Sequence, residues 1–275
     1  MHFDWYQATI PEVPNHLVEI LKRELAPLGT VETGRGRHNY NQSILIRSQG
    51  GERVACVLAG GSNGHPNVTS SGNVTSDFVE IVRAYWPNHN VTRFDAAQDF
   101  VSDDSWQKLE DCCRLVTAEH QVKGRAIVPD DASEGRTYYM GAPSSDVRAR
   151  LYEKTQELRK DLPPTRWHEV PEGMTRLELQ VRPKHPDARA YASTCTPEQV
   201  WGFSRWSREL AEKAFLLNVE RINSRIARES DDDRAFRFMV KQYAKVLKSH
   251  LKELGSWQCV GLQIGEEIAK LSKVK

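Results

Sequence analysis

In the segment Val147-Arg-Ala-Arg-Leu-Tyr-Glu-Lys154, apolar and polar side chains alternate from Val147 to Tyr152. Successive side chains of a β-strand point to opposite faces of a sheet, so a period of two predicts a strand with one apolar and one charged face. Four side chains would share the charged face: Arg148, Arg150, Tyr152 and Lys154. The rest of the fold can be worked outward from this strand, because two other segments repeat its pattern.

The two other segments are residues 91–100 and 175–182. Their polar faces carry Arg93, Asp95 and Asp99 in the first segment, and Arg176, Glu178, Gln180 and Arg182 in the second. If the three strands lie in one sheet, arginines and a lysine would surround three carboxylates and the phenol of Tyr152. Alternation of this kind is also what a half-solvated strand of any antiparallel sheet shows, and a single tyrosine on such a face is more often a packing residue.

The combined polar face suits phosphoryl transfer. Asp95, Asp99 and Glu178 would offer hard oxygen ligands of the kind that hold Mg²⁺ or Mn²⁺. Such a cation would neutralise a scissile phosphate and help to lower the pKa of the phenol from its ordinary value of about 10. Deprotonated Tyr152 could then attack phosphorus, leaving a phosphotyrosine and a free 3′-hydroxyl. Arginine and lysine side chains would hold the flanking phosphates.

The whole chain predicts an α+β fold, with a large, mostly antiparallel sheet flanked by helices and a helical C-terminal section. Strands are expected at 3–10, 44–46, 54–58, 91–100, 125–128, 137–139, 147–153 and 175–181, and helices at 16–25, 78–86 and 106–121. The segment Gly60–Gly72 is rich in Gly, Ser and Asn and predicts a long loop. Thr196 is expected to cap a helix that begins at Pro197, with Gln199 completing the capping box, and from there helical periodicity dominates. Residues 1–195 are therefore expected to form a sheet-rich catalytic region, and residues 196–275 a helical section packed on the same domain.

Composition sets the broad class. The chain has 275 residues, 39% of them hydrophobic and 27% charged, which is enough apolar material for a sizeable core. A formal net charge of +1 does not exclude nucleic acid, because 38 basic and 37 acidic residues can gather on different faces. Five cysteines without a C-x-x-C pair favour a reduced, cytoplasmic protein. No signal-peptide pattern opens the sequence, and no apolar run is long enough for a membrane span.

Several motifs follow one another in the order of a known family. The run Gly141-Ala-Pro-Ser-Ser-Asp146 and the strand Arg150-Leu-Tyr-Glu-Lys154 resemble a glycine-serine turn followed by an R-[LIV]-Y-[DE]-K strand. Further matches are Thr92–Asp99 (an R-x-D-x-x-x-D strand), Arg176-Leu-Glu178 (an R-x-E strand), Phe3-Asp-Trp5 (the opening) and Tyr243–Trp257 (a closing helix and Gly-Ser turn). In these features the chain resembles the Rep_trans family of rolling-circle replication initiators, found in plasmids, filamentous phages and integrative elements. The resemblance spans nearly the whole chain.

The resemblance assigns roles position by position. Tyr152 would be the nucleophile. Asp95 and Glu178 would bind Mg²⁺ or Mn²⁺, with Asp99 as a weaker candidate ligand. The residues that would contact DNA are Arg150, Lys154 and Arg176, with Arg93 on the same face. The general base is not identified. Lys154 or a metal-bound hydroxide would serve, whereas an arginine stays protonated.

The implied function is site-specific nicking of one strand at the origin of a small replicon, in the cytoplasm of a bacterial host. The resemblance implies three partners: single-stranded or hairpin origin DNA, a host helicase and a host polymerase. It also implies a homodimer and no association with a membrane. Two other functions stay open. One is a relaxase that nicks a transfer origin by the same chemistry, and the other is a catalytically inert DNA-binding regulator on the same scaffold.

Other motifs point elsewhere. No H-x-H pair occurs among the nine histidines, so the histidine-hydrophobe-histidine metal site of the other large nickase superfamily is absent from the sequence. Gly34-Arg-Gly-Arg37 lacks the Gly-Lys-Ser/Thr ending of a phosphate-binding loop and predicts a basic loop near DNA, or only a loop. Aromatic residues at helical spacing, which are more often core than base-stacking residues, are Trp201, Phe203, Trp206 and Phe215.

Overall fold

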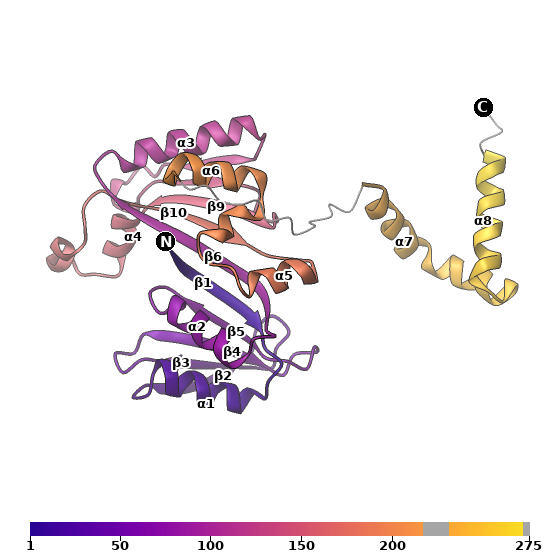
Figure 1. The fold of residues 1–275 in the computed structure, drawn as a ribbon, viewed down its shortest axis with the longest axis horizontal. Helices are drawn as coiled ribbons and strands as arrows, with labels where there is room; N and C mark the ends of the chain where they lie inside the picture. The colour runs from indigo at the N-terminus through magenta and orange to yellow at the C-terminus, as the bar shows by residue number, and fades with distance from the viewer. Residues whose placement is uncertain (217–230, 272–275) are drawn as a thin grey trace. The chain divides into compact units, whose positions relative to one another are not determined.

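One antiparallel sheet organises the larger part of the molecule. In the computed structural model, which describes residues 1–216 and 231–271, ten strands lie in the order β2-β3-β4-β5-β1-β6-β10-β9-β8-β7 (Figure 1). The strands are β1 (His2–Thr9), β2 (Thr30–Arg35), β3 (Gln42–Arg47), β4 (Arg53–Ala59), β5 (Asn67–Ser71), β6 (Asn90–Val101), β7 (Gly124–Ile127), β8 (Thr137–Met140), β9 (Val147–Glu153) and β10 (Met174–Val181). The expected α+β fold with an antiparallel sheet is confirmed.

Helices cover one face of this sheet. The α-helices are α1 (Pro14–Leu25), α2 (Thr75–Tyr85), α3 (Ser105–Glu119), α4 (Lys154–Lys160), α5 (Pro186–Ala192), α6 (Arg205–Phe215), α7 (Asp231–Leu254) and α8 (Trp257–Leu271), and the 3₁₀ helices are η1 (Ala132–Glu134), η2 (Pro164–Glu169) and η3 (Gln199–Phe203). One hydrophobic core joins α1, α2, α3, α5, η3 and α6 to the apolar side chains of the strands. The opposite face of the sheet is therefore free of these helices and carries the polar side chains.

The sheet has two halves with the same connectivity. Each half starts at a central strand, passes through a helix and returns to the centre by a four-stranded meander: β1-α1-β2-β3-β4-β5, then β6-α3-β7-β8-β9-β10. The two central strands pair with each other, and Tyr6 lies opposite Phe94. As a result β10 lies beside β6 and β9 beside β10, although long segments of chain separate them. This arrangement decides where the polar faces of the three strands meet.

Two sequence predictions for the first half are wrong. The segment Gly60–Gly72 is not one long loop, because it contains β5, which pairs with β1 and β4. Small polar side chains of β5 are buried, and the hydroxyl of Ser70 donates a hydrogen bond to the Val54 carbonyl oxygen at 2.7 Å. Asn and Ser form strands poorly by themselves, and here pairing with β1 and β4 holds them in the sheet. Gly34-Arg-Gly-Arg37 is not entirely a loop, because its first two residues end β2.

The chain divides into two compact units, Met1–Ser224 and Arg225–Lys275. The expected change at residue 196 does not coincide with this boundary, since η3 and α6 pack on the sheet. The Thr196–Gln199 capping box forms, with Thr196 N donating to Gln199 Oε1 at 2.9 Å, but the turn it caps continues as the 3₁₀ helix η3. Trp201 and Phe203 are buried, which confirms their core assignment. Packing of the remaining helical section on the same domain stays a prediction.

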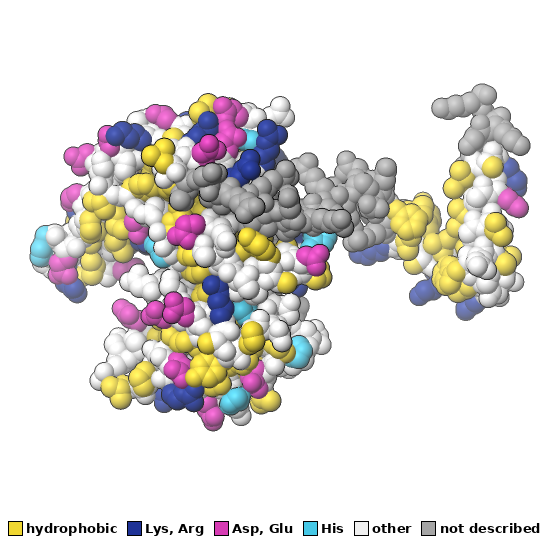
Figure 2. Space-filling view, viewed as in Figure 1, with side chains coloured by type: hydrophobic (Ala, Val, Ile, Leu, Met, Phe, Trp, Pro, Cys, Tyr) yellow, Lys and Arg dark blue, Asp and Glu magenta, His cyan; other side chains and the backbone are white. Residues whose placement is uncertain are grey.

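The second unit consists of α7 and α8, joined at Gly255, which has a φ of 75°. The closing helix and Gly-Ser turn expected at 243–257 are thus observed. Both helices expose hydrophobic side chains, drawn yellow in Figure 2. Among them are Tyr243 on α7 and Trp257 on α8. Within the described residues, none of the helices has the length and apolarity that crossing a bilayer requires.

Candidate functional site

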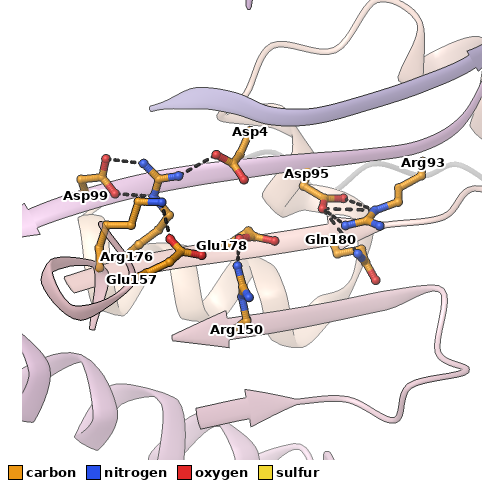
Figure 3. Close-up of polar contacts among 10 residues, drawn as sticks. Asp4, Arg93, Asp95, Asp99, Arg150, Glu157, Arg176, Glu178 and Gln180 are labelled. Carbon is orange, nitrogen blue, oxygen red and sulfur yellow. Dashed lines mark hydrogen bonds and ion pairs between the residues drawn. The ribbon is translucent and has the colours of Figure 1, made fainter. Parts of the chain in front are cut away.

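The candidate site lies on the open face of β6, β10 and β9, which are neighbours in the sheet. The registers of β10 with β6 and with β9 place polar side chains in three cross-strand rows. The rows are Asp99–Arg176–Tyr152, Glu178–Arg150 and Asp95–Gln180–Arg148. The three polar faces predicted from alternation therefore form one surface, and Figure 3 shows the carboxylates and guanidinium groups facing one another across it.

A tight turn starts β9 and fixes its register. Gly141, which follows β8, has a φ of 90°, in the left-handed region that favours glycine. The turn is closed by Ser145, whose backbone N–H donates to the Ala142 carbonyl at 2.9 Å and whose hydroxyl accepts from Ala142 N at 3.2 Å. Because a slip of one residue would turn every side chain of a strand to the other face, this turn places Tyr152 on the polar surface.

Tyr152 is nearly buried, with 5% of its surface exposed. The Arg150 guanidinium carbon lies 4.0 Å from the centre of its ring, and Lys154 Nζ lies 5.7 Å from it. Burial raises the pKa of the phenol well above its usual range, while Arg150 and Arg176 act in the opposite direction. Lys154 is not on the strand as predicted but begins α4, where it forms an ion pair with Glu157. The phenol as it stands is therefore protonated and screened by cationic side chains.

Arg176 is fixed by two carboxylates. Its Nε and Nη2 donate to the two oxygens of Asp99 at 2.5 and 2.7 Å, and its Nη1 donates to Asp4 Oδ1 at 2.6 Å (Figure 3). Asp4 was missed as a site residue, although the Phe3-Asp-Trp5 opening was noted. It reaches the site because β1 has an irregularity in its pairing between Phe3 and Trp5. Asp99 thus orients the guanidinium that faces Tyr152.

Asp95 is the most deeply buried acid of the site, with 1% of its surface exposed. Arg93 Nε donates to Asp95 Oδ1 at 3.0 Å, and Gln180 Nε2 donates to Asp95 Oδ2 at 3.4 Å. Burial raises the pKa of Asp95 to about 7, although Arg93 lowers it; the nearby Glu178 carboxylate raises it further. Burial therefore favours the protonated form of Asp95, and an added positive charge would favour its ionised form.

A cavity of about 280 Å³ opens between these rows. Its wall includes the carboxylates of Asp4, Asp95 and Glu178, whereas Asp99 does not line it. Glu178 accepts from Arg150 Nη2 at 3.0 Å. Across the part of the chain that the structure describes, no three His, Cys, Asp or Glu side chains gather closely enough to hold a metal ion.

The donor chemistry nevertheless fits a hard cation. Asp95 and Glu178 are diagonal neighbours on adjacent strands and open into the same cavity. Mg²⁺ is usually held by one or two carboxylates together with substrate phosphates and water, not by a complete protein cage. These two side chains could supply that share, provided that Arg93 and Arg150 release them.

The fold of this chain is similar to that of a known protein, although no protein-family model and no curated protein matches its sequence. Among solved structures, the rolling-circle replication initiator protein from Geobacillus stearothermophilus superposes with a TM-score of 0.50 and 19% sequence identity, over 80% of this chain and 97% of that one. The chain has the fold of a rolling-circle replication initiator. The family resemblance stated from the sequence is confirmed at the level of the fold, and at this identity the likeness assigns no roles to individual residues.

Proposed function

We propose that the chain is a rolling-circle replication initiator that nicks one DNA strand at an origin, with Tyr152 as nucleophile. The observation that carries the proposal is the row Asp99–Arg176–Tyr152, in which a phenol faces a fixed guanidinium on a sheet shared with an initiator protein. Arg150, stacked on the phenol ring, offers a second guanidinium. Two arginines beside one hydroxyl nucleophile match the need to hold a phosphate next to it.

The proposed reaction exchanges one phosphate ester for another. The Tyr152 oxygen forms a bond to phosphorus while the bond from phosphorus to the 3′ oxygen breaks, so the 5′-phosphate remains on the protein. The proton lost by the phenol is finally taken up by the departing 3′ oxygen. Arg150 and Arg176 stabilise the charge on the phosphate as it becomes five-coordinate. The reverse reaction rejoins the ends, because the phosphotyrosine keeps the energy of the broken ester.

A divalent cation, Mg²⁺ or Mn²⁺, would supply the positive charge that neutralises the phosphate and favours the ionised phenol. Asp95 and Glu178 would hold it from the cavity side. Asp99 is better placed to orient Arg176, since both of its oxygens accept from that guanidinium. Arg93 would turn from Asp95 toward DNA when the cation enters. Lys154 would contact the DNA backbone from the start of α4.

Tyr152 must become accessible for this chemistry. The residue is 5% exposed and Arg150 stacks on its ring, so an entering phosphate would draw the guanidinium of Arg150 and the side chain of Lys154 away from the ring. This burial also favours the second candidate function, a DNA-binding regulator on the same scaffold that does not cleave. The two candidates differ in one observable, covalent attachment to DNA.

The partners proposed are single-stranded or hairpin origin DNA, with a helicase and polymerase of a bacterial host acting after the nick in its cytoplasm. A homodimer is the proposed assembly. A relaxase acting at a transfer origin would use the same chemistry and the same residues. Nicking of the replication origin but not of a transfer origin, carried by the same element, separates these two roles.

The test is covalent capture of DNA. Purified protein is incubated with labelled single-stranded DNA from the origin of its own replicon, with Mn²⁺ or with EDTA. We expect a protein–DNA adduct with Mn²⁺ only, and a loss of roughly 100-fold or more in Asp95→Asn and Glu178→Gln. Glu110→Gln, a substitution on helix α3 away from the cavity, is the control and keeps the wild-type rate. Binding without cleavage in any metal would favour the regulator instead.

A further inference from the structure

Three buried hydrogen-bond donors of the site find no acceptor among the residues that the structure describes. They are Trp5 Nε1, Arg148 Nε and Arg150 Nε. All three belong to residues that line the 280 Å³ cavity described above. Leaving a buried donor unpaired is unfavourable, so three such donors on residues of one cavity point to a ligand that carries acceptors.

Arg148 differs from the other arginines of the cavity. Arg93 is tied to Asp95, and Arg150 to Glu178, whereas the ion pairs found among the described residues include none for Arg148. Its guanidinium carbon instead lies 4.2 Å from the centre of the Tyr139 ring. This stacking orients the plane of the guanidinium, and no described carboxylate forms an ion pair with it. A planar, oriented guanidinium without an ion-pair partner is well suited to binding phosphate.

The position of Arg148 follows from the spacing of the strand. Side chains on one face of β9 recur every two residues, about 6.8 Å apart, so Arg150 lies one step and Arg148 two steps from Tyr152. Neighbouring phosphates of an extended single strand of DNA have a similar separation. A strand of DNA that runs along β9 with its scissile phosphate at Tyr152 would therefore bring the phosphate two linkages away to Arg148, while Arg150, stacked on the Tyr152 ring, stays at the scissile phosphate.

We propose that Arg148 and Trp5 form a second phosphate subsite, which binds the phosphodiester two linkages from the scissile one. Arg148 donates from its fork to the phosphate oxygens, and the Trp5 indole N–H donates to the same group. The inference rests on the proposed function, because the scissile phosphate defines the register. A cavity of this size lies just below the range of about 300–1,000 Å³ usual for small ligands, which suits one phosphodiester with its sugar better than a whole nucleotide.

The first test measures the salt dependence of binding to oligothymidine, for wild type and for Arg148→Gln. Each phosphate neutralised on a single strand contributes about 0.7 to the slope of log K against log salt concentration. We expect Arg148→Gln to lower the slope by about 0.7 and to weaken binding roughly tenfold at moderate salt. The control is Arg114→Gln, which removes an arginine stacked on Tyr138, at 5.0 Å on the other face of the sheet. An unchanged slope in Arg148→Gln overturns the proposal.

The second test locates the contact and does not depend on how well a variant folds. The nickable origin strand is made with single methylphosphonate linkages, which are uncharged, at successive positions on both sides of the nick. In wild type, a neutral linkage two positions from the nick on one side should weaken binding roughly tenfold, and in Arg148→Gln the same linkage should cost nothing further. Trp5→Phe, which keeps a ring but removes the N–H, should show a smaller loss at that linkage. Independent effects of the linkage and of Arg148→Gln would refute the subsite.

The two tests separate this inference from the proposed function. If wild type forms no covalent adduct but binds oligothymidine with a slope that depends on Arg148, the nicking function and the register of the subsite fail, and only the phosphate contact of Arg148 stands. If wild type nicks DNA while Arg148→Gln changes neither slope nor linkage profile, the subsite fails and the nicking function stands.

Discussion

Replacing Arg176 by methionine should destabilise the larger unit by about 3 kcal/mol. The Arg176 side chain is 7% exposed and those of Asp4 and Asp99 are 20% and 24% exposed, so the substitution would leave two poorly solvated carboxylates without a cation. Removing one partner from a fully buried ion pair costs about 3–5 kcal/mol, and partial solvation of the acids places this case at the lower end. For a unit of this size the loss corresponds to roughly 6–12 °C in melting temperature.

Arg166→Met is the matched control. Arg166 also forms a two-pronged contact, with donor distances of 2.8 and 2.7 Å to Glu169, but these side chains are 55% and 44% exposed. An exposed pair of this kind contributes about 0–1 kcal/mol and weakens in salt. Urea-induced unfolding followed by circular dichroism, at low and high salt, measures both. The reasoning is refuted if Arg176→Met loses no more stability than Arg166→Met.

Two further predictions concern backbone strain and pH. Gly141→Ala should lower the free energy of unfolding by about 2 kcal/mol, because φ is 90° and the added Cβ would lie 2.9 Å from the carbonyl oxygen of Val147. Gly261→Ala is the control and should cost no stability, because nothing lies within 4 Å of its added Cβ. Equal urea midpoints for the two variants would contradict this prediction. Burial lowers the pKa of His89, whose ring nitrogens contact the Tyr6 hydroxyl and the Trp86 carbonyl, each at 2.7 Å. The folded state therefore binds fewer protons than the unfolded state below about pH 6.5, so the stability that neutral His89 contributes should be lost as pH falls from 7 to 5. His89→Gln should show a smaller loss over that interval in urea unfolding, and an identical pH profile would argue against the assignment.

The strands that matter most for function could be predicted because apolar and charged residues alternate along them. Each of β6, β9 and β10 buries one face on the helices and must leave the other polar, so the period of two is strong. The order of strands could not be predicted. The order depends on which central strand the last strand of each meander pairs with, and no single segment of the sequence determines that pairing. β5 was missed because its Asn, Ser and Thr residues form a strand only when β1 and β4 flank them.

Part of the candidate site could also be predicted. Arg150, Tyr152 and Arg176 lie together as the alternation and the family resemblance required. The partners of the charged groups could not be predicted, since ion pairs between strands depend on register. Asp4 enters through an irregularity in the pairing of β1, which no local sequence signal marks.

Arg148 stood on the predicted polar face but received no role. Its distinctive features, a ring beneath it on β8 and the lack of a carboxylate opposite, emerge only from the pairing of the strands. Likewise, the three predicted metal ligands do not all line the same cavity. Asp95 and Glu178 line the cavity while Asp99 holds Arg176, a division that follows from the register of β6 with β10.

The most direct measurement of the central claim is identification of the residue that becomes attached to DNA. Wild type, Tyr152→Phe and Tyr138→Phe are incubated with the origin strand and Mn²⁺, and the adduct is digested and sequenced by mass spectrometry. Tyr138→Phe removes the same atom from a tyrosine on the helix-covered face of β8. The account predicts a phosphodeoxynucleotide on Tyr152 in wild type and in Tyr138→Phe, and no adduct in Tyr152→Phe. An adduct that persists in Tyr152→Phe, or that maps to another residue, would contradict it.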